Sequence, residues 1–226
     1  MNQLRYVYAV CRPFEAALQA DLAGVGGAPL EQLEHGDLVA VLSPVPYADF
    51  GYEPLRAHLE DSGWLTETAR THQAVIAALT TVTCPLPLRL GTIFRDDSGV
   101  RTMLQDEGDQ LRTLLSRIDG CVEWGVKVYA EPAAHPARAA SFAHALHDEL
   151  TARSAATRLH PPSLSRDFGR IALNGSYLVE RSDCEEFVAH VERVGEQEPG
   201  LRVELGGPWA AYSFSDPEGG SGDRER

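Results

Sequence analysis

The order of extended and helical patterns between Arg5 and Gly91 limits what this chain can fold into more than any other feature. A β-branched and aromatic run is followed by a helical segment, two extended runs, an amphipathic helix and a run that contains prolines. This order, βαββαβ, is the split arrangement in which two helices cover one face of an antiparallel sheet. We therefore expect an α+β protein whose first domain, residues 1–119, is ferredoxin-like.

Turn and breaker residues set the boundaries of these segments. The predicted segments are strands at Arg5–Cys11, Leu30–His35, Asp37–Leu42 and Pro85–Gly91, with helices at Phe14–Leu22 and around Leu65–Leu79. Gly36 suits a tight hairpin turn. The last strand is expected at a sheet edge, because prolines cannot donate to a central ladder. A further helix, Asp97–Ile118, has a weak point at Glu107-Gly108 and is expected to bridge to a second domain.

A second, related α+β unit with an antiparallel sheet and a long helix is predicted over residues 120–215. Its first strand alternates apolar and other residues from Val122 to Tyr129, so Trp124 and Val126 are expected in the core and Glu123 on the opposite, polar phase. The later segments are a helix at Ala139–Leu159, a strand at Ile171–Val179, a helix opened by a capping box at Ser182–Glu185, and a strand at Leu201–Leu205. Residues 216–226 are polar and glycine-rich, and we expect them to form a disordered tail.

Composition excludes several classes of function. A net charge of -13 and a pI near 5.0 repel phosphate backbones, so no nucleic acid is expected as a partner. No window reaches the roughly 18 apolar residues of a membrane helix, and the first residues lack the pattern of a signal peptide. The four cysteines never approach a C-x-x-C spacing, which favours buried thiols in a reducing compartment. We expect a soluble cytoplasmic protein that does not bind membranes.

No motif points to catalysis or to a cofactor. Gly24, Gly26 and Gly27 resemble a dinucleotide fingerprint, but no strand precedes them and Pro29 stands where a third glycine is needed, so a loop is expected. There is no G-x-S-x-G elbow, and Cys84, before Pro85 in an apolar strand, is expected to be an unreactive buried thiol. We predict no catalytic residues and no cofactor.

Histidines are the remaining candidates for metal binding. His144 and His147 lie three residues apart on a predicted helix, where Asp148 or His135 is a potential further ligand. Local spacing fixes no third ligand at coordination distance, so no metal site is predicted. His72 lies on the apolar stripe of its helix, and we interpret it as a core histidine.

The most unusual segment is the apolar finish of the chain, Gly206 to Phe214. It carries Trp209, Tyr212 and Phe214 in quick succession before the polar tail. Two interpretations are open: the aromatic side chains fold back as a lid on the second core, or they form a partner-binding surface, because aromatic residues dominate binding hot spots.

Five stretches in order resemble the gas vesicle protein L/F family. They are Arg5–Val10, Leu86–Thr92, Glu123–Val128, Gly175–Val179, and Gly207–Trp209 with Tyr212–Phe214. Together they span residues 5 to 214. The sequence departs from the family's pattern at Ala210-Ala211, where members commonly carry two prolines, so the terminal segment here is expected to be less rigid.

The resemblance implies an assembly or minor structural protein of gas vesicles, with no reaction and no cofactor. The implied partners are the small hydrophobic shell protein and other gas vesicle accessory proteins, and the implied location is the gas vesicle in the cytoplasm. Exposed sheet edges or an aromatic patch are two physical ways to hold such a shell protein. The alternative function is a small-molecule-binding or oxygenase-like protein on a ferredoxin-like fold, because fold alone does not decide function.

Overall fold

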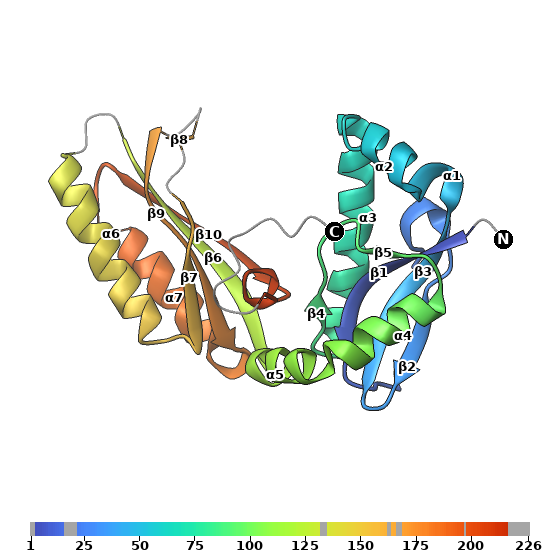
Figure 1. The fold of residues 1–226 in the computed structure, drawn as a ribbon. Helices are drawn as coiled ribbons and strands as arrows, with labels where there is room; N and C mark the ends of the chain where they lie inside the picture. The colour runs from blue at the N-terminus through green and yellow to red at the C-terminus, as the bar shows by residue number, and fades with distance from the viewer. Residues whose placement is uncertain are drawn as a thin grey trace. The chain divides into compact units, whose positions relative to one another are not determined.

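The chain forms two compact units, each an antiparallel sheet with helices (Figure 1). The computed structural model describes residues 3–15, 22–131, 135–161, 164–165, 169–196 and 198–216. The N-terminal unit holds the residues up to Asp119 together with Ser215 and Asp216, and the C-terminal unit is Gly120–Phe214. The predicted fold class, α+β with two small domains, is confirmed.

The sheet of the N-terminal unit has the strand order of a ferredoxin-like fold. Its strands are β1 (Gln3–Cys11), β2 (Glu31–His35), β3 (Leu38–Pro46), β4 (Leu86–Pro87) and β5 (Ile93–Phe94). They are arranged β2-β3-β1-β4, all antiparallel, and β5 also pairs with β1. Gly36 turns the chain between β2 and β3 with a φ of +62°, a conformation that glycine adopts without strain.

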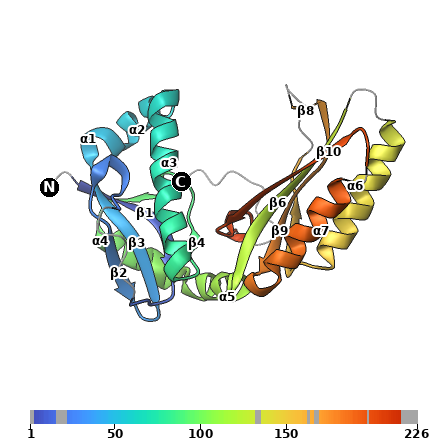
Figure 2. The same ribbon diagram turned by 180° about the vertical axis from the view of Figure 1, so that it is seen from behind.

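The helices of this unit bury apolar side chains, except for Tyr52–His58, which has no buried residue. They are α1 (Tyr47–Phe50), α2 (Tyr52–His58), α3 (Ser62–Val82), α4 (Asp97–Asp106) and α5 (Gly108–Ile118), and a 3-10 turn, η1, spans Val25–Gly27. Figure 2 shows α3 running along the sheet, against which it buries His72, Val75, Ile76 and Leu79. Asp61 caps α3 by accepting hydrogen bonds from the N–H groups of its first turn.

Three expectations for this unit need correction. Arg12–Glu15 are not helical, and the rest of the helix predicted at Phe14–Leu22 lies largely outside the described residues. The predicted strand Pro85–Gly91 is reduced to two residues, although it is at the sheet edge as expected. The helix predicted at Asp97–Ile118 is two helices, divided at the weak point that was expected at Glu107-Gly108: Glu107, with a φ of -99° and a ψ of 5°, ends α4 and precedes α5. Its bridging role stays a prediction.

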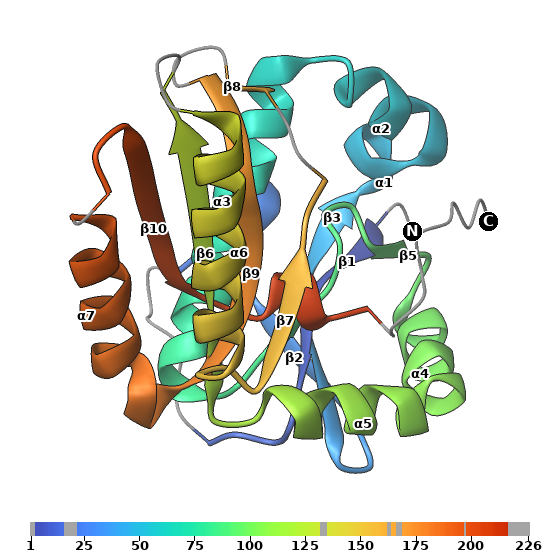
Figure 3. The same ribbon diagram turned by 90° about the vertical axis from the view of Figure 1, so that its left-hand side faces the viewer.

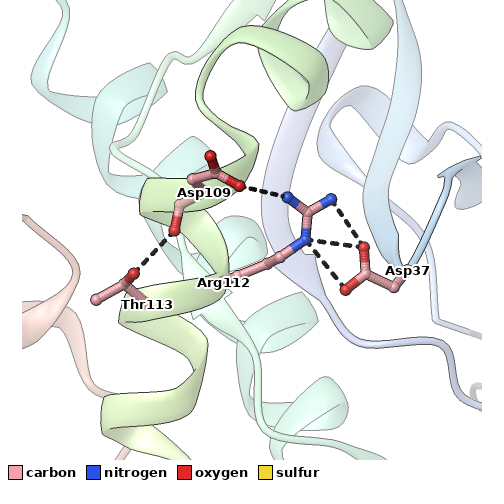
Figure 4. A network of polar contacts seen from close by, with 4 residues as sticks. All are labelled: Asp37, Asp109, Arg112 and Thr113. Atoms are coloured by element: carbon pink, nitrogen blue, oxygen red, sulfur yellow. Dashed lines mark hydrogen bonds and ion pairs between the residues drawn. The ribbon is translucent and has the colours of Figure 1, made fainter.

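A surface ion network ties α5 to the β2–β3 hairpin (Figure 4). Arg112 Nε donates to both carboxylate oxygens of Asp37, at 2.9 and 3.1 Å, and its Nη1 donates to Asp109 at 3.0 Å. The hydrogen bond from Arg112 lowers the pKa of the Asp37 carboxyl. These groups are exposed, so the network stabilises the fold only weakly.

The C-terminal unit repeats the plan of a sheet covered by two helices. Its strands are β6 (Cys121–Ala130), β7 (Ala156–Leu159), β8 (Leu164–Ser165), β9 (Gly169–Glu180) and β10 (Leu201–Trp209) in the order β10-β6-β9-β7, with β8 also on β9. Helices α6 (Pro136–Thr151) and α7 (Cys184–Gly195) lie on one face (Figure 3). Trp124 and Val126 point into that core as predicted. The 3-10 turns are η2 (Arg181–Asp183) and η3 (Tyr212–Phe214).

The predicted long helix, the capping box and the last strand differ from the structure. Helix α6 ends at Thr151, because Ala156–Leu159 pairs with β9 as strand β7 instead of continuing the helix. The capping box at Ser182–Glu185 is wrong: η2 precedes α7, and Ser182 Oγ donates to the Asp183 carboxylate. Strand β10 continues past Leu205 to Trp209, with a register shift after Gly206.

Candidate functional site

A buried carboxylate fixes the terminal aromatic segment on the sheet face opposite α6 and α7. Glu123 lies on the polar phase of β6, yet it is only 4% exposed. Ser213, in η3, donates its backbone N–H to Glu123 Oε2 at 2.8 Å and its hydroxyl to Oε1 at 2.6 Å. Charge-assisted bonds of this kind offset the cost of removing a carboxylate from water. Glu123 therefore holds η3 against the sheet.

The hydrogen-bonded network extends from Ser213 to two further side chains. The Oγ atoms of Ser213 and Ser176 are 3.0 Å apart, and His160 Nε2 lies 2.8 Å from Ser176 Oγ. Because Ser213 gives its one hydroxyl proton to the carboxylate, the proton of Ser176 is left for the Ser213 oxygen. In the tautomer that carries its proton on Nε2, His160 donates to Ser176. The network joins β6, β9 and η3, and it was not predicted from the sequence.

Trp209 lies over two glycines that face each other across the ladder. Gly125 in β6 and Gly206 in β10 are paired residues. A Cβ added to Gly206 would come within 2.5 Å of Trp209 Cη2, and one added to Gly125 within 2.9 Å of Cζ3. The missing side chains let one face of the indole rest on the backbone. Trp209 remains 51% exposed, so part of the ring faces solvent.

The structure separates the three aromatic residues that the sequence analysis grouped together. Trp209 is exposed, Tyr212 is 37% exposed, and Phe214 is buried at 1% exposure. Burial first, and then the charge of Glu123, raise the pKa of Tyr212 to about 12, so the phenol is neutral at ordinary pH. Phe214 is the buried member of this segment, although it is not among the residues of the core that α6 and α7 cover, and Trp209 and Tyr212 form the exposed part of the segment.

The histidines have contacts of other kinds. His144 is highly exposed and lies 3.5 Å from the Asp148 carboxylate, whereas His147 Nδ1 is 3.0 Å from the Tyr177 hydroxyl. Within the described ranges no group of three or more His, Cys, Asp or Glu is placed to hold a metal ion. His72 is a core histidine as interpreted, 2% exposed and 3.1 Å from the Tyr6 hydroxyl.

The predictions of buried cysteines and of a glycine loop are confirmed for some of these residues and wrong for Cys84. Cys84 lies outside any strand and is half-buried, with its thiol donating to the Ile118 carbonyl at 3.0 Å, so its placement in a buried strand was wrong. Cys11 is buried, and burial raises its pKa to about 12. Gly26 and Gly27 form a turn with positive φ, as expected of a loop.

Comparison with known proteins decides the family. The family model described as gas vesicle synthesis protein GvpL/GvpF matches residues 4–139 and 133–216. The chain belongs to this family. This GvpL/GvpF protein is 47% identical to gas vesicle protein L of Streptomyces sp. (strain CB03234), over 95% of its own length and 93% of that protein. It is 28% identical to gas vesicle protein F2 of Halobacterium salinarum, over 93% and 91% of the two chains.

Solved structures show the same fold. The crystal structure of the gas vesicle protein GvpF from Anabaena sp. PCC7120 matches with a TM-score of 0.77 at 18% identity, covering 95% of this chain and 97% of that one. GvpF from Microcystis aeruginosa matches with a TM-score of 0.75 at 17% identity, covering 95% and 99%. The resemblance noted in the sequence is thereby confirmed, and a role in gas vesicle assembly follows from the family. None of the described helices is long and apolar enough to cross a membrane.

Proposed function

We propose that this GvpL/GvpF protein binds the small hydrophobic shell protein during vesicle assembly, without catalysing a reaction, and that Trp209 and Tyr212 form the contact surface. The proposal rests on the seating of Trp209, which is fixed on a glycine platform while 51% of it stays exposed. Aromatic side chains held in this way offer a large apolar area at little cost in conformational entropy, as binding hot spots require.

The contacts around η3 support preorganisation of this surface. Phe214 is buried, and Ser213 is bound at two atoms by Glu123, so the segment between them and Trp209 is fixed before a partner arrives. An interaction surface that is already ordered loses less entropy on binding. In this proposal Phe214 anchors the segment, whereas Trp209 and Tyr212 contact the partner.

The chemistry of the partner explains why such a surface is useful. Monomers of a very hydrophobic shell protein aggregate unless their apolar surfaces are covered. A protein with a net charge of -13 stays dispersed while a small aromatic surface engages the monomer. Other gas vesicle proteins are further candidate partners of the same surface.

A pull-down with folded variants tests the proposal. Trp209→Ala and Tyr212→Ala are compared with Tyr52→Ala, which removes an aromatic side chain that is 76% exposed on α2. At least one of the first two should keep its melting temperature within about two degrees yet lose roughly 2 kcal/mol or more of binding to the shell protein. Tyr52→Ala should bind normally. Full retention of the shell protein by both site variants would remove Trp209 and Tyr212 from the contact surface.

A further inference from the structure

Strand β10 and helix α7 border a groove in the C-terminal unit that the aromatic site does not use. The groove has a volume of about 710 Å³. Its apolar lining residues are Val191, Leu201, Val203 and Leu205. Glu131, Glu192 and Glu196 also line it, together with Arg202, whose guanidinium pairs with Glu204, so the lining is acidic on balance. The groove thus combines an apolar floor with acidic groups.

The groove follows an open sheet edge. Among the strands that the structure describes, β10 pairs with β6 alone, and it spans nine residues. The edge strand of the other sheet, β2, is shorter and charged, and Arg101 Nη1 donates to its Glu34 carbonyl at 2.8 Å. Charged residues and side-chain contacts of that kind protect an edge from pairing with another chain. Strand β10 also carries Arg202, Glu204 and Pro208, but it is longer and presents apolar residues beside the groove.

The pairing of β10 with β6 determines which backbone N–H and C=O groups of β10 point away from β6. Glu131 N–H donates to the Gly200 carbonyl at 3.0 Å, and these residues oppose each other one step beyond the Leu201–Ala130 pair. Antiparallel ladders alternate between pairs that exchange hydrogen bonds and pairs that do not. The N–H and C=O groups of Val203 and Leu205 therefore point away from β6, toward the open edge.

We propose that an extended segment of the shell protein pairs with the β10 edge as a further strand. Apolar side chains of that segment lie on the groove floor, and its lysine or arginine side chains lie beside the acidic groups. This inference rests on the proposed function and gives it a second contact. Strand addition combines main-chain hydrogen bonds with pockets for alternate side chains. A second copy of this chain is the poorer occupant, because two grooves whose linings are acidic on balance would meet.

A labelled peptide of sequence Lys-Thr-Val-Thr-Val-Thr-Lys probes the edge, with Glu-Thr-Val-Thr-Val-Thr-Glu as its counterpart. The full-length protein should bind the lysine peptide at least about tenfold more tightly than the glutamate peptide. Two variants alter the groove. Val203→Pro removes a backbone N–H that points to the open edge. The double variant Glu192→Lys/Glu196→Lys replaces two exposed carboxylates of the groove lining with positive charges. Each should weaken lysine-peptide binding about tenfold or more. The matched control Glu185→Lys/Glu186→Lys changes the same charges on α7 outside the groove and should leave binding within about twofold.

Equal binding of the lysine peptide by the wild type and both groove variants would overturn the inference. So would a wild-type dimer that Val203→Pro converts to a monomer, because the edge would then be a self-association surface. Pull-down of the shell protein separates this inference from the proposed function. If the wild type and both groove variants retain the shell protein equally, the strand-addition site is contradicted and the proposed function is supported. If the wild type retains no shell protein while the lysine peptide binds as expected, the proposed function is contradicted and β10 is still supported as a strand-binding edge.

Discussion

Ser213 and Glu123 are 90 residues apart in sequence but share two hydrogen bonds, from the Ser213 N–H and hydroxyl to the two oxygens of the Glu123 carboxylate. This contact fixes the terminal segment on the C-terminal sheet. It converts an apolar run at the end of the chain into an ordered surface that presents Trp209 and Tyr212.

Removing the carboxylate should loosen that segment. Glu123→Ala leaves the donors of the half-buried Ser213 without their carboxylate partner, so we expect a loss of roughly 1 to 3 kcal/mol in the free energy of unfolding. Urea denaturation measures the loss, and amide exchange at Tyr212–Phe214 should become faster. Glu185→Ala, at an exposed position of α7, is the control and should change little. An unchanged midpoint and unchanged exchange in Glu123→Ala would contradict this role.

The core histidine predicts a pH dependence of stability. Burial is the main cause that lowers the pKa of His72 from 6.5 to about 4, so the folded state favours the neutral ring. Its contribution is complete above the unfolded pKa near 6.5 and is lost as the pH falls from there toward 4, by about 1.4 kcal/mol for each pH unit. Denaturation midpoints of the wild type and His72→Gln between these values test it. Parallel pH profiles for the two proteins would show that His72 is not the titrating group.

The second core should depend on Trp124. Its side chain is 8% exposed, its Nε1 donates to Cys184 Sγ at 3.4 Å, and its ring lies 6.4 Å from that of Phe187, between centroids. Trp124→Ala should cost roughly 3 to 5 kcal/mol, because a large cavity replaces the ring. Trp209→Ala, which removes the same side chain from an exposed site, should cost much less. Similar losses for the two variants in chemical denaturation would argue against this placement of the two tryptophans.

The glycine platform predicts a binding defect without a core defect. In Gly206→Ala the new Cβ would come within 2.5 Å of the Trp209 ring, so the indole must move off the sheet. We expect weaker shell-protein capture and an altered Trp209 fluorescence spectrum, with a small change in stability. Gly99→Ala is the control, because its nearest atom would be 3.5 Å away, an ordinary contact. Normal capture by a folded Gly206→Ala protein would show that the seating of Trp209 does not matter for binding.

Local patterns were sufficient where local physics decides the structure. The alternation from Val122 to Tyr129 identified β6 and its core residues, and Gly36 identified the first hairpin. The ferredoxin-like arrangement expected of the N-terminal unit agrees with its strand order, although its first predicted helix lies largely outside the described residues. The helical period around His72 also identified it as a core residue.

Long-range pairing explains what the sequence could not predict. Ala156–Leu159 resembles a helix end and becomes a strand only because β9 offers it a ladder. Glu123 is bonded by Ser213, 90 residues away, and the seating of Trp209 depends on Gly125, in another strand. The pairing of Gly125 with Gly206 is a property of the strand register, so no local pattern in the sequence announces it.

The most direct test of the central claim is complementation of a deletion strain that has no second L/F-type copy. Without this protein we expect the shell protein to be made but no intact vesicles to form, and the wild-type gene should restore them. Trp209→Ala/Tyr212→Ala, produced as a folded protein at the wild-type level, should fail to restore vesicles, whereas Tyr52→Ala should succeed. Counts of intact vesicles by electron microscopy give the answer, and normal vesicles with the double variant would contradict the account.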